Sequence, residues 1–227
     1  MHNLRIAATG AGLAAMLPLF LLLTDTSTGA ADLETMVRLH QHPAFPLRVA
    51  LTALYFPAVL LSHFALAWSS HQVWAWWGFS LFAIGNGIDA VYRAVQFGVV
   101  HYRWCAAWLE ATDPGVRESL EVRITAFGEV GAGVYIAFAM FFGLGRLSLG
   151  AATVSAPVRS TKILGLSFIV VGALNVLPWI GRITGLPWLA GLGGYYLVPW
   201  LVNLLLLAAV LWRWPAPAGA DSSLTAG

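Results

Sequence analysis

Charged residues are scarce in this chain: Asp, Glu, Lys and Arg together make up only 10% of its 227 residues. Soluble domains carry about 25% charged residues, so an ordinary water-exposed fold is excluded. The formal net charge is only +2 and no basic run occurs, so we expect no nucleic-acid partner. Apolar residues fill the sequence instead, since 59% are hydrophobic and the mean hydropathy is +0.76.

Cysteine is almost absent as well. Cys105 is the only one, so the chain can form no internal disulfide and no thiolate metal cluster. A zinc-binding His-Glu-x-x-His motif is also missing, and so is a pair of acidic residues of the kind that membrane proteases use. We therefore expect no cofactor.

Long apolar runs dominate the sequence. A helix needs about 20 apolar residues to cross a bilayer, and windows of that length predict roughly six spans. These lie at 4–23, 47–68, 73–100, 124–144, 163–180 and 188–212. Most of the 11 Trp residues fall at the ends of the runs, where lipid headgroups favour them. The sequence predicts an all-α, polytopic transmembrane helical bundle that forms one domain over 1–214, with a disordered tail at 215–227.

The first run has a second interpretation as a signal peptide. Arg5 gives it a basic start, and Thr28, Gly29 and Ala30 resemble a cleavage site. Its apolar stretch is longer than most signal sequences, so we expect a retained span. Basic residues are divided almost evenly between the two sides, but the connection at 145–162 is purely basic. The positive-inside rule then places both termini in the cytoplasm.

A polar stripe interrupts the third run. Asn86, Asp89, Arg93 and Gln96 follow one another at spacings of three, four and three, which places them on one face of a helix. A charge near the bilayer centre costs about 3 kcal/mol on insertion scales, so such residues usually face protein or a cavity. This stripe predicts a functional site.

Polar residues of other spans fall at a similar depth. At a rise of 1.5 Å per residue, counting from the predicted outer ends places them roughly 8 to 11 Å deep. The predicted polar layer contains Tyr55, Asn86, Asp89, Arg93, Gln96, Glu129, Asn175 and Tyr195, with Tyr196 next to the last. One interpretation is a structural network in which Arg93 bonds to Asp89 and Glu129. The other is a pocket for a small polar or amphiphilic ligand, which a cavity bordered by Arg93 would favour and a dry contact would oppose.

The histidines raise the question of a metal. His40 and His42 would hold copper or zinc if His101 joined them, but solvated loop residues are the more common case. His63 lies inside the second span, and no other histidine matches its depth for a bis-histidine haem. We expect a packed, hydrogen-bonded core histidine there.

Two short motifs carry a resemblance to known proteins. They are Tyr92-Arg-Ala-Val-Gln96 in the third span, and the segment from Lys162 to Gly172 that opens the fifth with a basic residue, Leu-Gly and a later Gly. With its length, the chain resembles a group of bacterial six-span integral membrane proteins of unknown function. The resemblance implies a bacterial inner-membrane protein and supplies no activity or substrate.

These observations favour a non-enzymatic membrane protein that has a small-ligand site or an accessory role in the bilayer. An alternative is a membrane enzyme that acts on a lipid or isoprenoid with Glu129 or Asp89 as acid or base. A third is a purely structural partner of other membrane proteins.

Overall fold

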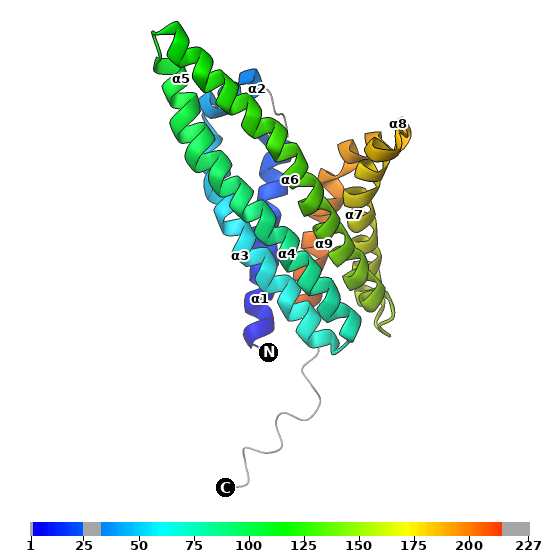
Figure 1. The fold of residues 1–227 in the computed structure, drawn as a ribbon. Coiled ribbons are helices and arrows are strands. Elements are labelled where there is room, and N and C mark those ends of the chain that lie inside the picture. The colour runs from blue at the N-terminus through cyan, green and yellow to red at the C-terminus, as the bar shows by residue number, and fades with distance from the viewer. Residues whose placement is uncertain (1, 25–32, 215–227) are drawn as a thin grey trace.

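The computed structural model describes residues 2–24 and 33–214, and every regular element in these ranges is a helix. The long helices form a bundle (Figure 1) and are α1 (His2–Thr24), α3 (Phe45–Ser70), α4 (Val73–Val95), α6 (Pro114–Val154), α7 (Arg159–Thr184) and α9 (Leu197–Trp212). The predicted helical bundle is therefore confirmed. The tail at 215–227 lies outside the described residues.

Short helices lie between the long ones along the chain. They are α2 (Leu33–Gln41), the π-helix η1 (Gln96–Cys105), α5 (Ala106–Glu110), α8 (Pro187–Ala190) and the 3₁₀-helix η2 (Gly191–Tyr195). The apolar side chains Met36, Val37 and Leu39 of α2 are buried, which explains why this polar segment folds back onto the bundle. The elements η1 and α5 directly continue α4, so the third helix does not end at residue 100.

Fewer helices meet the criterion for crossing a membrane than the six predicted spans. By length and composition, α1, α3, α6 and α7 are long and apolar enough, and α8 with η2 and α9 adds a fifth if this bent segment is one span. The helix α4 does not meet the criterion, because Trp side chains and the charges of Asp89 and Arg93 lower its hydropathy. The count of six is therefore not confirmed.

The last predicted span, 188–212, is broken rather than straight. Its two parts meet at an angle of 50°. Gly191, Gly193 and Gly194 lie directly before the bend, and glycine weakens a helix. Pro199 lacks the N–H group that would bond back to Tyr195. The bend follows from this composition.

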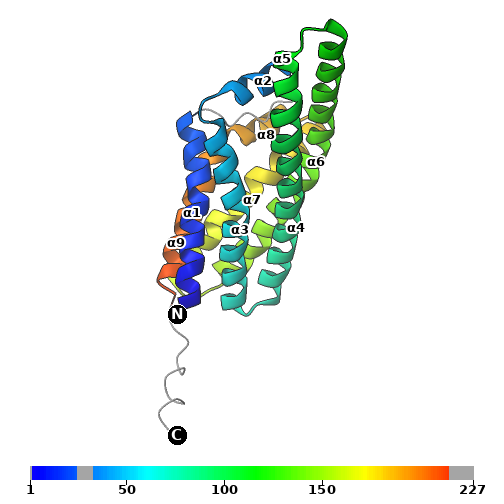
Figure 2. The same ribbon diagram turned by 90° about the vertical axis from the view of Figure 1, so that its left-hand side faces the viewer.

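The longest helix, α6, has 41 residues and spans about 61 Å, twice the thickness of the hydrocarbon core. Its first turn is capped: Asp113 Oδ1 accepts N–H groups from Gly115 at 2.7 Å and Val116 at 3.1 Å, and Pro114 is the first helical residue. Together, α5 and residues 114–123 project beyond the other helices (Figure 2), and we call this part the arm.

Glycines bring α6 into backbone contact with both of its neighbours. A Cβ atom on Gly145 would lie 2.5 Å from Phe82 N and 2.7 Å from Gly78 O of α4. On the side of α7, a Cβ atom on Gly143 would lie 3.0 Å from Gly172 O. Small residues allow membrane helices to approach this closely, and the close approach maximises van der Waals contact. Helices α4, α6 and α7 therefore form one tightly packed unit.

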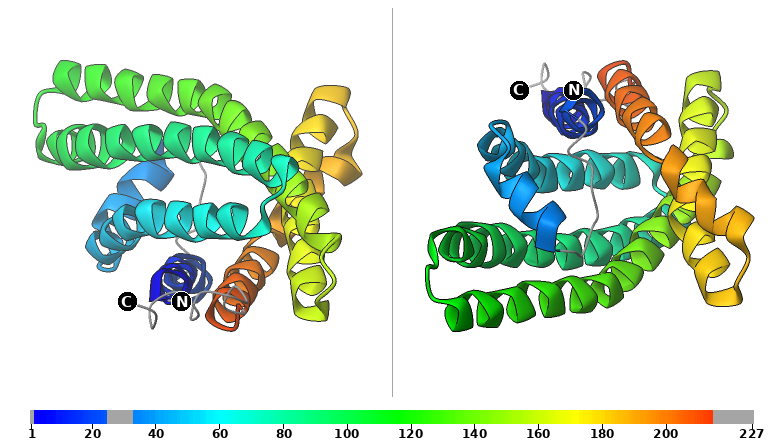
Figure 3. Two further views of the ribbon diagram at one scale, coloured as in Figure 1. Left: turned by 90° about the horizontal axis from the view of Figure 1, so that it is seen from below. Right: turned by 90° about the horizontal axis from the view of Figure 1, so that it is seen from above.

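The other helices complete the enclosure. Helix α1 packs against α3 and α9 through alanines, among which Ala7, Ala11 and Ala14 are fully buried. Seen along the bundle, α4 and α6 lie on one side and α1 and α9 on the other, with α3 and α7 between them (Figure 3). This arrangement surrounds the centre of the bundle.

Candidate functional site

A cavity of about 520 Å³ lies in the centre of the bundle, enclosed by α1, α3, α4, α6, α7 and the bent segment of η2 and α9. This volume falls within the range of small-molecule pockets. Ten of the lining residues are aromatic. The polar ones are Arg48, Thr52, Asp89, Arg93, Gln96, Asn175 and Arg182.

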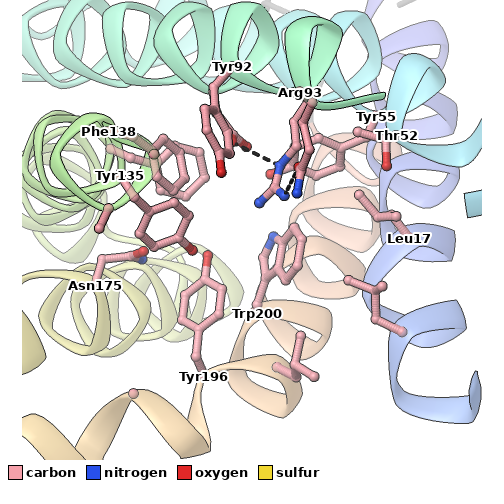
Figure 4. Close-up of a pocket in the computed structure, with 18 of the residues that line it drawn as sticks. Leu17, Thr52, Tyr55, Tyr92, Arg93, Tyr135, Phe138, Asn175, Tyr196 and Trp200 are labelled. Carbon is pink, nitrogen blue, oxygen red and sulfur yellow. Dashed lines mark hydrogen bonds and ion pairs between the residues drawn. The ribbon is translucent and has the colours of Figure 1, made fainter. Parts of the chain in front are cut away.

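Arg93 is fixed in the wall of this cavity by two neighbours on its own helix. Its Nε donates to Asp89 Oδ1 at 3.2 Å, and its Nη1 donates to Gln96 Oε1 at 2.8 Å. The ion pair expected from the polar stripe is thus present. Arg93 points into the cavity (Figure 4), and its side chain keeps 19% exposure while that of Asp89 keeps 14%. Its Nη2 makes no hydrogen bond to a described residue.

Aromatic side chains face Arg93 from the other helices. Tyr135 of α6, Tyr196 at the junction of η2 and α9, and Trp200 of α9 point toward the centre of the cavity (Figure 4). The rings of Tyr55 and Trp200 meet edge to face, with centroids 5.4 Å apart. Among the described residues, the Tyr55 hydroxyl and the Trp200 indole N–H have no hydrogen-bond partner of normal geometry, and both atoms are buried. The wall therefore presents mainly flat aromatic surface to the cavity.

Five of the eight residues predicted for the polar layer line the cavity. They are Tyr55, Asp89, Arg93, Gln96 and Asn175. The amide of Asn175 donates to the Val171 carbonyl of its own helix at 2.8 Å. Asn86 is buried beside the cavity, with its Nδ2 3.5 Å from Phe56 O, where it joins α4 to α3.

Two predicted members of the layer lie elsewhere. Glu129 is exposed and borders a separate groove with Glu118 and Glu121, so the predicted pairing with Arg93 is wrong. The cavity face of α6 passes through Gly128 and Ala132, and the rotation of the helix turns Glu129 away from it. Counting residues along a span gives depth but not this rotation.

Tyr195 is the second correction. Its side chain is 72% exposed, and its neighbour Tyr196 lines the cavity instead. The chain changes from η2 to α9 at this point, with a bend of 50°. Helical periodicity counted from Trp188 therefore does not carry through to the two tyrosines.

The histidines do not form a metal site. Among the described residues, no group of three His, Cys, Asp or Glu side chains is close enough to hold an ion. His42 Nδ1 instead accepts the N–H of Ala44 at 3.1 Å, in the turn before α3. The ring of His101 stacks on that of His40 with centroids 6.4 Å apart. Burial, with the nearby Arg48, lowers the pKa of His101 to about 4, so its ring is neutral at neutral pH.

His63 is the packed core histidine that the sequence analysis expects. Its Nδ1 donates to the Val59 carbonyl at 2.8 Å, and its ring stacks on that of Phe82 with centroids 3.9 Å apart. The side chain is fully buried. It does not line the cavity.

Arg146 is a buried residue of α6 that none of the predicted spans includes. The fourth predicted span ends at residue 144, which assigns Arg146 to a loop, but α6 continues to Val154 and buries this side chain completely. Its Nη1 lies 3.5 Å from Tyr196 Oη, and its Cζ lies 4.3 Å from the centre of the Phe142 ring. The absence of proline between Leu144 and Val154 is the signal that permits a longer helix.

The lining contains few of the groups that carry out nucleophilic catalysis. Among the described residues, neither Ser, Cys nor His lines the cavity, and its one carboxylate, Asp89, is bound by Arg93. The Thr52 hydroxyl in this wall donates to the Arg48 carbonyl at 2.8 Å. Glu129, the other acid considered for catalysis, lies outside the cavity. Comparison with protein-family models, characterised proteins and solved structures gives no significant match to this chain.

Proposed function

We propose that this protein is a multi-pass membrane protein that binds a small amphiphilic ligand inside its helical bundle. The observation that carries the proposal is the cavity bordered by Arg93, since a purely structural network would meet there in a dry contact. The aromatic lining suits an apolar body, and the few polar groups suit one polar end. The size of the cavity suits a single small molecule.

Six crossings of a bacterial inner membrane form part of this proposal. The beginning of α1 and the end of α9 lie at the same end of the bundle (Figure 1), which requires an even number of crossings. With α1, α3, α6, α7 and the bent segment as five, α4 supplies the sixth. Arg5, Arg159, Lys162 and Arg213 lie at this same end, and their positive charge favours the cytoplasm.

Filling the cavity is expected to prevent binding. Ala132 of α6 lines it, and Ala132→Phe would place a ring in the space that a ligand needs. The probe is bromoundecanol in nanodiscs of zwitterionic lipid, because bromine quenches the fluorescence of nearby tryptophans such as Trp179 and Trp200. We expect saturable quenching in the unmodified protein and at least roughly tenfold weaker binding in Ala132→Phe, which corresponds to the loss of about 1.4 kcal/mol.

The matched control is Ala137→Phe. Ala137 lies on the same helix and is also exposed, but it does not line the cavity, so this variant is expected to bind like the unmodified protein. Equal binding by both variants would show that the probe binds elsewhere and would contradict the proposed function.

A further inference from the structure

The charges around the cavity are unequal. Arg48, Arg93 and Arg182 line it, whereas Asp89 is the one acidic residue in its described lining. Arg146 lies directly behind the wall and contacts the lining residue Tyr196. In the part of the chain that the structure describes, Arg93, Arg146 and Arg182 therefore lie around a space whose lining contains one carboxylate.

The excess of positive charge around the cavity extends into the core of the bundle at Arg146. The side chain is fully buried, and its Nε and Nη2 have no partner among the described residues. A buried cation without a counter-ion costs several kcal/mol. Its Nη1 lies 3.5 Å from the hydroxyl of Tyr196, which belongs to the cavity wall. Arg146 therefore places positive charge directly behind this wall.

Two arginines present charge to the space itself. Arg93 is held in place by Asp89 and Gln96, which leaves its Nη2 available for a guest. Arg182 of α7 stacks on Trp179, with its Cζ 4.4 Å from the ring centre. Arg93, which is held by two side-chain partners, loses little side-chain entropy when it binds an anion, and charge-assisted hydrogen bonds are stronger than neutral ones.

Together with the proposed function, on which this step rests, these observations identify the chemical class of the ligand. We propose that the cavity binds an anionic amphiphile, whose carboxylate or phosphate group is held by Arg93 and Arg182 and whose apolar body lies among the aromatic rings. Negative charge at this position offsets the excess of guanidinium groups.

A cationic ligand is the obvious competitor, because aromatic cavities also bind cations through their ring faces. In this protein, arginine side chains already lie close to several of the aromatic rings. Arg93 lies 5.5 Å from the ring centre of Tyr92, Arg146 lies 4.3 Å from that of Phe142, and Arg182 lies over Trp179. A further cation would meet like charge at each of these rings.

The test compares three probes that share one chain and differ in the head group: bromoundecanoate, bromoundecyl phosphate and bromoundecanol. Quenching of tryptophan fluorescence is measured in zwitterionic nanodiscs at mildly alkaline pH, where the carboxyl group is ionised. We expect at least one anion to bind roughly tenfold more tightly than the alcohol, an advantage that added salt reduces. The tighter of the two anions identifies carboxylate or phosphate as the preferred group.

Arg182→Gln provides the variant for this test, because Arg182 is exposed at the cavity and its replacement leaves no buried charge unpaired. We expect roughly fivefold weaker binding of the anions and unchanged binding of the alcohol. The matched control is Arg117→Gln. Arg117 is also exposed and also stacks on a tryptophan, with its Cζ 4.0 Å from the ring centre of Trp108, but it lies on the arm. This variant is expected to bind all three probes normally.

The possible failures are distinguishable. If the alcohol binds as tightly as both anions, or if Arg182→Gln changes nothing, the anionic inference is overturned while the cavity remains a binding site. If no probe gives saturable quenching that Ala132→Phe abolishes, the proposed function itself fails, and the inference that rests on it fails too.

Discussion

Replacing Gly145 with alanine is expected to lower the free energy of unfolding by about 3 kcal/mol or more. The added Cβ atom would lie 2.5 Å from Phe82 N, 2.7 Å from Gly78 O and 2.8 Å from Phe82 Cα. All three are backbone atoms, which cannot rotate away as the end of a side chain can. The two helices would have to separate along their interface, which weakens packing between α4 and α6 over many residues.

Unfolding of the purified protein in mixed detergent micelles measures this effect. The control is Gly133→Ala, because Gly133 lies on the same helix and a Cβ atom there would meet nothing within 4 Å. Its stability is expected to stay within about 1 kcal/mol of the unmodified protein, with any gain due to better helix propensity. If the two variants were equally stable, the backbone contact between α4 and α6 would not exist in the protein.

Removing Arg93 is expected to have the second large effect. In Arg93→Ala the carboxylate of Asp89 loses its ion pair inside the bundle, and breaking such a pair costs about 3 to 5 kcal/mol. Asp89→Ala leaves Arg93 with Gln96 as its remaining partner, so this change also destabilises the fold. The double variant Asp89→Ala/Arg93→Ala leaves no lone charge, so we expect it to lose much less stability than the sum of the two single changes.

The same unfolding assay gives the coupling energy of the pair. Glu129→Gln is the control, because Glu129 is exposed and borders the groove outside the cavity, and its stability is expected to change by less than about 0.5 kcal/mol. Additive losses in the double variant would contradict the ion pair, and a large loss in Glu129→Gln would show that this residue contacts a charge after all.

Hydrophobic run length predicts much of this fold. The spans predicted at 47–68 and 163–180 lie within α3 and α7, because in a bilayer a helix satisfies the backbone polar groups of an apolar run and tolerates Pro57 and Pro178. The start of α6 is also predictable, since Asp113 and Pro114 cap a helix by local chemistry.

The cavity is only partly predictable, for geometric reasons. Local spacing on one helix places Asp89 next to Arg93, so that pair follows from the sequence alone. Glu129 matches their depth, but its orientation depends on how the glycines of α6 fit against α4 and α7. The burial of Arg146 depends on where α6 ends. A count of apolar residues places that end too early, because the helix extends beyond the apolar run.

The length of α6 has a mechanical consequence. This one helix contains both a wall of the cavity at Ala132 and residues 114–123 of the arm. The two parts therefore move together as a single stiff rod. Gly115 and Ala132 are separated by about 26 Å along the axis. A tilt of about 10° at the wall would therefore shift the arm by roughly 4 Å, a displacement that a pair of spin labels in water can record without touching the bilayer.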